Sequence, residues 1–398
     1  NSLLQKMVYL SYKQYLKNFA LLLEISTMKS KIIKLLSSPK LFVYSLVWLM
    51  ILVTVGTVSQ KDIGLYASQQ KYFSSYLFTF GPIPFPGGRV VLALMLVNLI
   101  SMMFKQNLWK MKKLGVIIVH LGGVMLLVGA GLTAMFSSEG SMVIEEGSKS
   151  NTVDDYHITE LAIINVSNPN YDQYTIFGEP LFSSGNNLMH ENFEFDITVL
   201  EYMDNATLET NEGPPTIGFK GMLENFNLVE LGRDKDDMKN KPAIIFQVSG
   251  TFSDTDGIYG LIFGQSVPAT ININSNQYVM ALQKKKTYLP FTIELKDFKK
   301  VMHPGTEVAK SYSSKINLIE DNIPRPVLIE MNKPLRHQGY TFYQASFIES
   351  PNGEETTVLA AVNNYGRLFP YISSIVMSIG LLLHMLVNMP NLFKKKKP

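Results

Sequence analysis

Long apolar runs without a charged residue constrain this chain more than any other feature of its sequence. A helix needs about 17 to 25 predominantly apolar residues to cross the hydrocarbon core of a bilayer. Three of four such runs reach that length, and the second reaches it only if the approach from Gly87 to Arg89 is counted. We therefore predict an integral membrane protein with four transmembrane helices in the lipid bilayer. The predicted helices cover residues 41–58, 89–104, 114–136 and 368–389.

Lysines flank these runs unevenly and thereby predict their orientation. Cytoplasmic segments next to transmembrane helices carry an excess of Lys and Arg. Lysine clusters precede the first run, separate the second from the third and follow the fourth, whereas the loop 59–88 holds only Lys61 and Lys71. We expect the loop 59–88 and the segment 137–367 to lie outside the cytoplasm. The predicted cytoplasmic segments are residues 1–40, 105–113 and 390–398.

The N-terminal 27 residues allow two interpretations. Their mixture of leucines, lysines and aromatic residues fits an amphipathic helix on the membrane surface. Alternatively, Met28 followed by Lys29 and Lys31 resembles a translation start, which would make residues 1–27 upstream sequence without a role. No small-residue cleavage site follows the first apolar run, so the sequence does not predict a removable signal peptide.

The segment 137–367 has the pattern of a β protein. Apolar and polar residues alternate from Phe193 to Val199, which is typical of a strand with one buried face. About ten to twelve such runs, separated by turn sequences, predict a large, mostly β, sandwich-like domain inserted between helices three and four. The charged stretch 232–241 is expected to be a solvated loop. Predicted strands include residues 161–166, 193–202, 243–248, 277–282, 288–298, 327–331, 339–348 and 356–362.

Composition excludes several classes of function. The chain has no cysteine, so it forms no disulfide, no thiol-based active site and no covalent bond to haem through a thiol. A net charge of +3 is too small to indicate nucleic acid as a partner. Four histidines in the segment 137–367 lack the spacing of a metal site, so we expect ordinary surface or hydrogen-bonding roles for them. They are His157, His190, His303 and His337.

Two histidines inside the apolar runs are the strongest candidates for a function, because ionisable residues in a membrane helix are costly. His120 and His384 each lie several residues from the expected cytoplasmic edge, so we predict similar depths for them. On a helix, Gly131 falls within about 20° of His120 and Gly123 within about 60°, which leaves room for a bulky group. His120 could thus be an axial ligand of haem iron, with His384 as a weaker candidate. Either histidine could instead hydrogen-bond a neighbouring helix.

Glycines and aromatic residues add two further expectations. Gly115, Gly122 and Gly129 recur every seven residues on a different face of the helix from His120, which favours close packing against another helix. The loop 59–88 is rich in Tyr and Phe. Those residues could form an aromatic belt at the membrane interface or belong to a re-entrant helix that lines a cavity.

Several short motifs, in order along the chain, together resemble the ResB (also called CcsB) family of cytochrome c biogenesis proteins, one subunit of the system II haem lyase. Each motif is weak alone, and the resemblance covers about residues 35–389. The motifs are Gly56-Thr57-Val58-Ser59-Gln60, the loop Tyr72–Tyr76, His120-Leu121-Gly122, the entry Gly140–Gly147, and Pro334-Leu335 with Gly339–Ser346.

The resemblance implies a function in haem delivery. Haem b would pass through the membrane to apocytochrome c outside, with His120 at the position of the family's membrane haem ligand. A ResC- or CcsA-like membrane partner would supply the other ligand and the tryptophan-rich haem loop, because this chain has only Trp48 and Trp109. The chain would then be a non-autonomous subunit in the inner membrane of a bacterium. Pro334–Ser346 could also be only a well-packed hairpin.

Two other functions remain open from the residues. The chain could be a membrane-anchored sensor or binding protein whose β domain carries no cofactor. It could also be a b-type electron-transfer cytochrome that holds haem between His120 and His384 of one chain. A visible spectrum of the purified protein separates these readings, because only the sensor is expected to be colourless.

Overall fold

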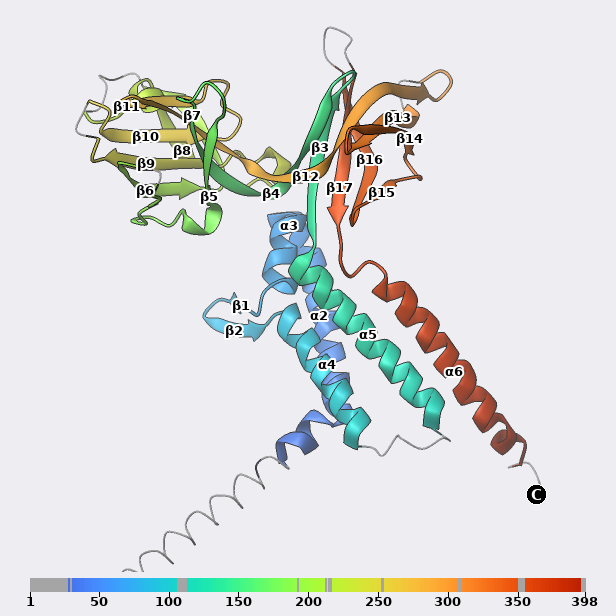
Figure 1. Ribbon diagram of the computed structural model, residues 1–398. Coiled ribbons are helices and arrows are strands. Elements are labelled where there is room, and N and C mark those ends of the chain that lie inside the picture. Colours follow the sequence, from blue (N-terminus) through green and yellow to red (C-terminus); the bar gives the residue numbers. More distant parts are fainter. Residues whose placement is uncertain are drawn as a thin grey trace, which may run out of the picture. The chain divides into compact units, whose positions relative to one another are not determined.

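The computed structural model describes residue 28, residues 31–105, 113–191, 193–211, 213, 217–251, 254–306, 309–349 and 355–394. Predictions for residues 1–27, for most of the loop 105–113 and for the last residues of the basic tail lie outside these residues. The chain divides into a helical unit, residues 1–60, 66–136 and 365–398, and a β unit, residues 61–65 and 137–364. Each unit is described by itself (Figure 1).

Four helices make up most of the helical unit, and three of them could cross a membrane. α2, α5 and the part of α6 up to Met389 are long and apolar enough to do so. α4 is apolar but shorter, so three of the four predicted helices have the length and composition to span a membrane, while the count of four stays a prediction. The helices are α2 (Pro39–Ile63), α4 (Gly88–Lys105), α5 (Leu114–Phe136) and α6 (Phe369–Lys394).

α5 and α6 pack together through the glycine stripe that the sequence indicated. Gly115, Gly122 and Gly129 are the buried residues of α5. A Cβ atom at Gly115 would lie 2.4 Å from the backbone nitrogen of His384, which leaves no room for a side chain. The same holds at Gly122 and Gly129, so the predicted close packing is confirmed. The α6 residues that these three glycines meet are His384, Met377 and Phe369.

The aromatic loop after α2 turns back along that helix. It contains α3 (Leu65–Ser68), the π-helical turn η1 (Gln69–Phe73) and a hairpin of β1 (Leu77–Phe80) and β2 (Ile83–Pro86). Phe73 covers Gly56, and the indole Nε1 of Trp48 donates to the carbonyl oxygen of Pro86 at 2.9 Å. The hairpin therefore ends beside the first half of α2. The return is made by two short helical segments and a hairpin, and both alternatives that the sequence left open, an interface belt and a re-entrant segment, stay predictions.

α4 begins where this hairpin ends, which explains why its apolar run is short. Trp48 lies nine residues after the start of α2, so the beginning of α4 is level with that point and not with the end of α2 at Ile63. Further along α4, the buried Asn98 donates to the carbonyl oxygens of Leu36 and Ser38, just before α2 begins. α4 thus runs antiparallel to the first part of α2, and the loop 64–87 packs along the remainder.

Fifteen strands of the described residues form the β unit, so the prediction of a large, mostly β domain is confirmed. They are β3 (Ser138–Glu145), β4 (Lys149–Asn165), β5 (Gln173–Gly178), β6 (Asp196–Met203), β7 (Ala206–Thr210), β8 (Phe226–Glu230), β9 (Ala243–Ser249), β10 (Gly257–Ile262), β11 (Ala269–Ile273), β12 (Asn276–Met302), β13 (Ala309–Glu320), β14 (Ile323–Glu330), β15 (Leu335–His337), β16 (Tyr340–Glu349) and β17 (Glu355–Asn363).

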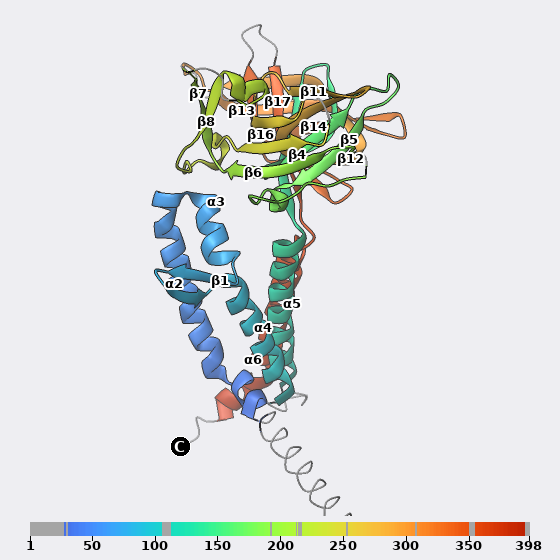
Figure 2. The same cartoon turned by 90° about the vertical axis from the view of Figure 1, so that its left-hand side faces the viewer.

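These strands form two lobes, each with its own core. In lobe A, the sheet β5-β4-β12-β11 packs against the sheet β10-β9-β6 around residues such as Leu161 and Phe246, which is a sandwich. In lobe B, the large sheet continues in the order β14-β13-β12-β4-β3-β17-β16-β15 around Ile293 and Phe342. β7 and β8 form a separate two-stranded sheet. Figures 1 and 2 show β4 and β12 running through both lobes.

The strand β12 corrects one element of the sequence prediction. The segments 277–282 and 288–298, predicted as separate strands, belong to a single strand of 27 residues. The lysines from Lys284 to Lys286 resemble a loop because this part of β12 lies between the cores of the two lobes. There the pairing with β4 is irregular: Lys284 pairs with Thr159 but Lys286 pairs with Asp154, so β4 bulges between them.

Candidate functional site in the helical unit

His120 lies on the side of α5 that faces away from α6. Successive residues of an α-helix are rotated by about 100°, so Gly115, Gly122 and Gly129 each lie about 140° to 180° around the helix from His120. Because these glycines contact α6, His120 points to the opposite side. Leu127, about 20° from His120, packs there with hydrophobic residues of α2 and α4. Figure 1 accordingly shows α5 between α4 and α6.

The imidazole of His120 is held by its own helix. Its Nδ1 lies 2.8 Å from the carbonyl oxygen of Val116, one turn earlier. A carbonyl oxygen only accepts, so Nδ1 is the donor in this contact and Nε2 is the ring nitrogen that remains for another partner. In a metal-ligating histidine, the ring nitrogen that does not bind the metal usually donates a hydrogen bond to a partner such as a backbone carbonyl. The half-buried His120 is therefore prepared to donate Nε2 to a metal.

The two glycines predicted beside His120 differ in their surroundings. No heavy atom outside the helix's own turns would lie within 4 Å of a Cβ at Gly131. At Gly123, Leu99 of α4 would be 3.2 Å away. The space next to this face of α5 is thus open at Gly131 and partly filled at Gly123.

His384 lies at a different level of the helix pair from His120. Its backbone contacts Gly115, so it is level with a residue five positions before His120, about 7 to 8 Å away along the helix. The two backbones are thus offset along the helix, and their depths in a membrane stay a prediction. Its ring also has a local partner, because the Nδ2 of Asn388 lies 3.2 Å from Nδ1 of His384. This partner lies on α6 itself, whereas the sequence left open a hydrogen bond to a neighbouring helix.

The motif around Gln344 forms a packed hairpin in lobe B. β15 and β16 pair as an antiparallel hairpin whose turn residues Gln338 and Gly339 both have positive φ. Behind it, the buried Gln344 accepts a hydrogen bond from Ser314 at 2.6 Å and donates to Thr357 at 2.9 Å. A buried network in which the polar groups satisfy each other rigidifies a core. The motif thus forms a well-packed hairpin, and a further role in binding is left to experiment.

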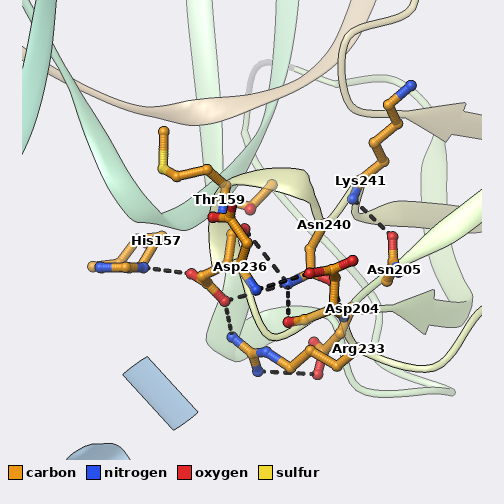
Figure 3. A network of polar contacts seen from close by, with 12 residues as sticks. His157, Thr159, Asp204, Asn205, Arg233, Asp236, Asn240 and Lys241 are labelled. Atoms are coloured by element: carbon orange, nitrogen blue, oxygen red, sulfur yellow. Dashed lines mark hydrogen bonds and ion pairs between the residues drawn. The ribbon is translucent and has the colours of Figure 1, made fainter. Parts of the chain in front are cut away.

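A network that the sequence did not predict ties the segment 232–241 to strand β4 (Figure 3). Nδ1 of His157 lies 2.5 Å from one carboxylate oxygen of Asp237, and Nη2 of Arg233 lies 2.6 Å from the other. Burial raises the pKa of Asp237, but the hydrogen bonds from Arg233 and His157 outweigh it and hold that pKa below its ordinary value. Most of this segment is exposed, as expected for a solvated loop, but the Asp237 side chain is only 14% exposed.

The bulge of β4 positions His157 for this contact. The backbone nitrogens of His157 and Ile158 both donate to a carboxylate oxygen of Asp155, which shapes the bulge. Lys284 of β12 lies close by, and burial lowers its pKa against the opposing effect of Asp237 and Asp155. No group of three or more potential metal ligands occurs in the part of the chain that the structure describes. Chemically, the network is a set of ion pairs that holds a loop on the junction of the lobes.

Comparison with known proteins identifies two similarities. A family model described as the ResB-like family matches residues 110–213 and 248–368, which is more than half of the chain and includes His120. Protein NrfI of Wolinella succinogenes is 22% identical over 307 residues. The match covers 74% of this chain and 30% of NrfI, so this chain spans less than a third of that relative's length. His384 lies outside both stretches matched by the family model.

Proposed function

This chain belongs to the ResB-like family, and from that premise we propose that it serves cytochrome c biogenesis as a subunit that carries haem in the membrane. The observation that carries the proposal is the 2.8 Å contact between Nδ1 of His120 and the carbonyl oxygen of Val116. It leaves Nε2 for the iron of haem b, on the side of α5 opposite α6.

The proposed topology follows from the lysine clusters. In this topology the protein is inserted in the inner membrane of a bacterium. Both termini and the loop 105–113 are on the cytoplasmic side, and the β unit is on the opposite side. This arrangement requires an even number of crossings before the C-terminus. α4 supplies the fourth crossing, together with the returning loop 64–87, which packs along the part of α2 that α4 does not reach.

A membrane partner completes the haem site in this proposal. His120 offers one ligand, and His384 cannot offer the second because the body of α5 separates it from the His120 face. The second axial ligand therefore comes from a ResC- or CcsA-like partner. Thioether bonds require the thiols of the apocytochrome, and this chain has no cysteine, so its own part is to hold and present the haem. In this proposal, attachment of haem to the apocytochrome also needs the ResC- or CcsA-like partner, which carries its own haem loop.

A visible spectrum of the purified protein tests the proposal. We expect a haem absorption band when the chain is co-expressed with a ResC-like partner, loss of most of that band in His120→Ala and retention of most of it in His384→Ala. A colourless complex would overturn the proposal and favour the sensor function. Equal loss in both variants would favour the single-chain b-type cytochrome instead.

A further inference from the structure

Strand β5 leaves one of its edges without a partner. It pairs only with β4, in a register without shifts in which Thr175 faces Ile163 and Ile176 faces Ala162. Among the described residues, no backbone group of Tyr174 or Ile176 makes a hydrogen bond outside that pairing. β5 is therefore an edge strand of lobe A, beside β4 and β12 in Figure 2.

The alternation of backbone groups shows which residues face this open edge. The nitrogen of Val166, just after β4, donates to Gln277 and so points toward β12. Neighbouring residues of a strand point to opposite sides, so Ile163 points toward β5 and bonds with Thr175. Tyr174 and Ile176 consequently direct their N–H and C=O groups away from β4, into the open edge.

Several other edges of the β unit are protected in recognisable ways. β14 carries Pro324 and Pro326, which cannot donate to an added strand. β15 has only three residues. In the second sheet of lobe A, Leu188 donates to Ile197 of β6, and Lys220 donates to Ile258 of β10, so adjoining segments cover both edges. β5 has no proline, no charged residue and no bulge.

The side chains at this edge are apolar and exposed. Tyr174 is 52% exposed and Ile176 is 43% exposed. On the same face of the sheet, Tyr174 lies opposite the half-buried Ile164 and Ile176 lies opposite the fully buried Ala162, so the exposed apolar surface is formed by the edge residues themselves. At the opposite edge of this sheet, β11 directs Thr270 and Asn272 outward, which are polar. Exposed apolar edges of this kind bind extended peptides by strand addition.

A hollow beside the start of β5 is lined by uncharged residues, like the edge of β5 itself. It has a volume of about 390 Å³ and contains no charged side chain. Amide and hydroxyl groups such as these hydrogen-bond a polypeptide backbone without selecting a charge. The residues that line it include Asn165, Ser167, Tyr171, Gln173 and Asn276.

We propose that the open edge of β5 binds an extended, apolar segment of the unfolded apocytochrome chain as an added strand. Only an extended polypeptide satisfies a row of backbone donors and acceptors, and an unfolded client exposes such segments. The identity of the client rests on the proposed function above. Strand addition would hold the client near this protein by its backbone, independently of where its cysteines lie.

The test uses the purified full-length protein and a haem-free c-type cytochrome polypeptide as the probe. Ile176→Pro removes an outward N–H group while leaving the pairing with β4 intact, and Thr270→Pro is the matched control on β11. We expect Ile176→Pro to weaken binding of the probe by about tenfold, because the proline removes one hydrogen bond to the added strand and its ring obstructs that strand. The control should bind like the unmodified protein.

A second variant and a second measurement guard against misfolding. Ile176→Lys places a charge at the edge without changing the backbone, and it should weaken binding as well. Hydrogen exchange of residues 173–178 should slow when the probe is added, whereas exchange of residues 269–273 should not. Unchanged binding in both Ile176 variants, or protection of β11 instead of β5, overturns the inference. Because His120→Ala is scored by its spectrum and not by probe binding, failure of this inference and failure of the proposed function are distinguishable.

Discussion

His120 and His384 lie on opposite sides of α5. The backbone of His384 contacts Gly115 in the interface between α5 and α6, whereas His120 is about 140° around the helix from Gly115 and five residues further along. No haem can bridge the two imidazoles with the body of a helix between them. His120, which the family model covers, is therefore on the opposite side of α5 from His384, which it does not cover.

This separation predicts different behaviour of the two histidines when their side chains are removed. In the complex with a ResC-like partner, His120→Gly should lose the haem band, and added imidazole should restore much of it by occupying the vacated position. His384→Gly should keep the band and show no response to imidazole. Absorption spectra across an imidazole titration measure both effects, and an imidazole response at position 384 would contradict the arrangement.

The glycine interface predicts strong sensitivity to added volume. Gly115→Val places atoms against the backbone of His384 and Gly380, which cannot move aside as a flexible side chain can. Overpacking of this kind typically destabilises by about 1 to 3 kcal/mol or more. We expect a clearly lower thermal unfolding midpoint in detergent. Gly131→Val, which meets no atom within 4 Å, is the matched control and should unfold nearly like the unmodified protein.

The hydrogen bond from Trp48 to Pro86 predicts an effect on the hairpin. Trp48→Phe keeps an aromatic ring but removes the donor, at a loss of about 1 to 2 kcal/mol. Hydrogen exchange should become faster in residues 77–86, as measured by mass spectrometry. Tyr76→Phe serves as the control, because the 65% exposed Tyr76 keeps its ring and should leave exchange unchanged. Equal exchange in Trp48→Phe and the unmodified protein would show that the hairpin is held by packing alone.

The Asp237 network predicts a dependence of stability on acid. A carboxyl group whose pKa is lower in the folded protein stabilises it above the unfolded value, near pH 4, and this contribution is lost as pH falls through the folded pKa. We expect Asp237→Asn to lower the unfolding midpoint at pH 7 and to make it less dependent on pH below about 4. Asp172→Asn, an exposed position, should change neither quantity. Thermal unfolding followed between pH 3 and pH 7 supplies the comparison.

The buried network in lobe B predicts that Gln344 is needed for folding. Gln344→Leu leaves Ser314 and Thr357 with fewer partners in a fully buried site, at a loss of about 1 to 3 kcal/mol. The neighbouring Tyr343 is 39% exposed, so Tyr343→Leu should have the smaller effect. Urea unfolding of the two variants decides between this structural role and a surface role for the motif. A larger loss in Tyr343→Leu would contradict the network.

Local patterns in the sequence were sufficient to predict some elements but not others. The glycine stripe was predictable because Gly115, Gly122 and Gly129 repeat with the period of one helix face. The bond from Trp48 to Pro86 joins residues 38 positions apart, so no local pattern indicates it. The contact from His157 to Asp237 spans 80 positions, and a charged segment such as 232–241 looks solvated until its partner is known.

The fusion of two predicted strands into β12 has a physical reason too. Strand prediction relies on an alternation between one buried and one wet face. Between the two cores that alternation stops, although the backbone continues as a strand, and the polar run from Lys284 to Lys286 then resembles a loop. The period of a helix likewise predicts that His120 lies on a different side of α5 from the three glycines. It does not predict which residues of other helices lie against that side.

The three glycines of α5 also limit how this membrane unit can move. A helix that meets its neighbour through side chains can rotate or slide by changing rotamers. α6 meets α5 backbone to backbone at Gly115, so neither helix can turn about its axis or shift lengthwise without collision. We therefore expect α5 and α6 to move together as one rigid pair. Any mobility near His120 must therefore arise on its other flank, where α2, α4 and the open space at Gly131 lie.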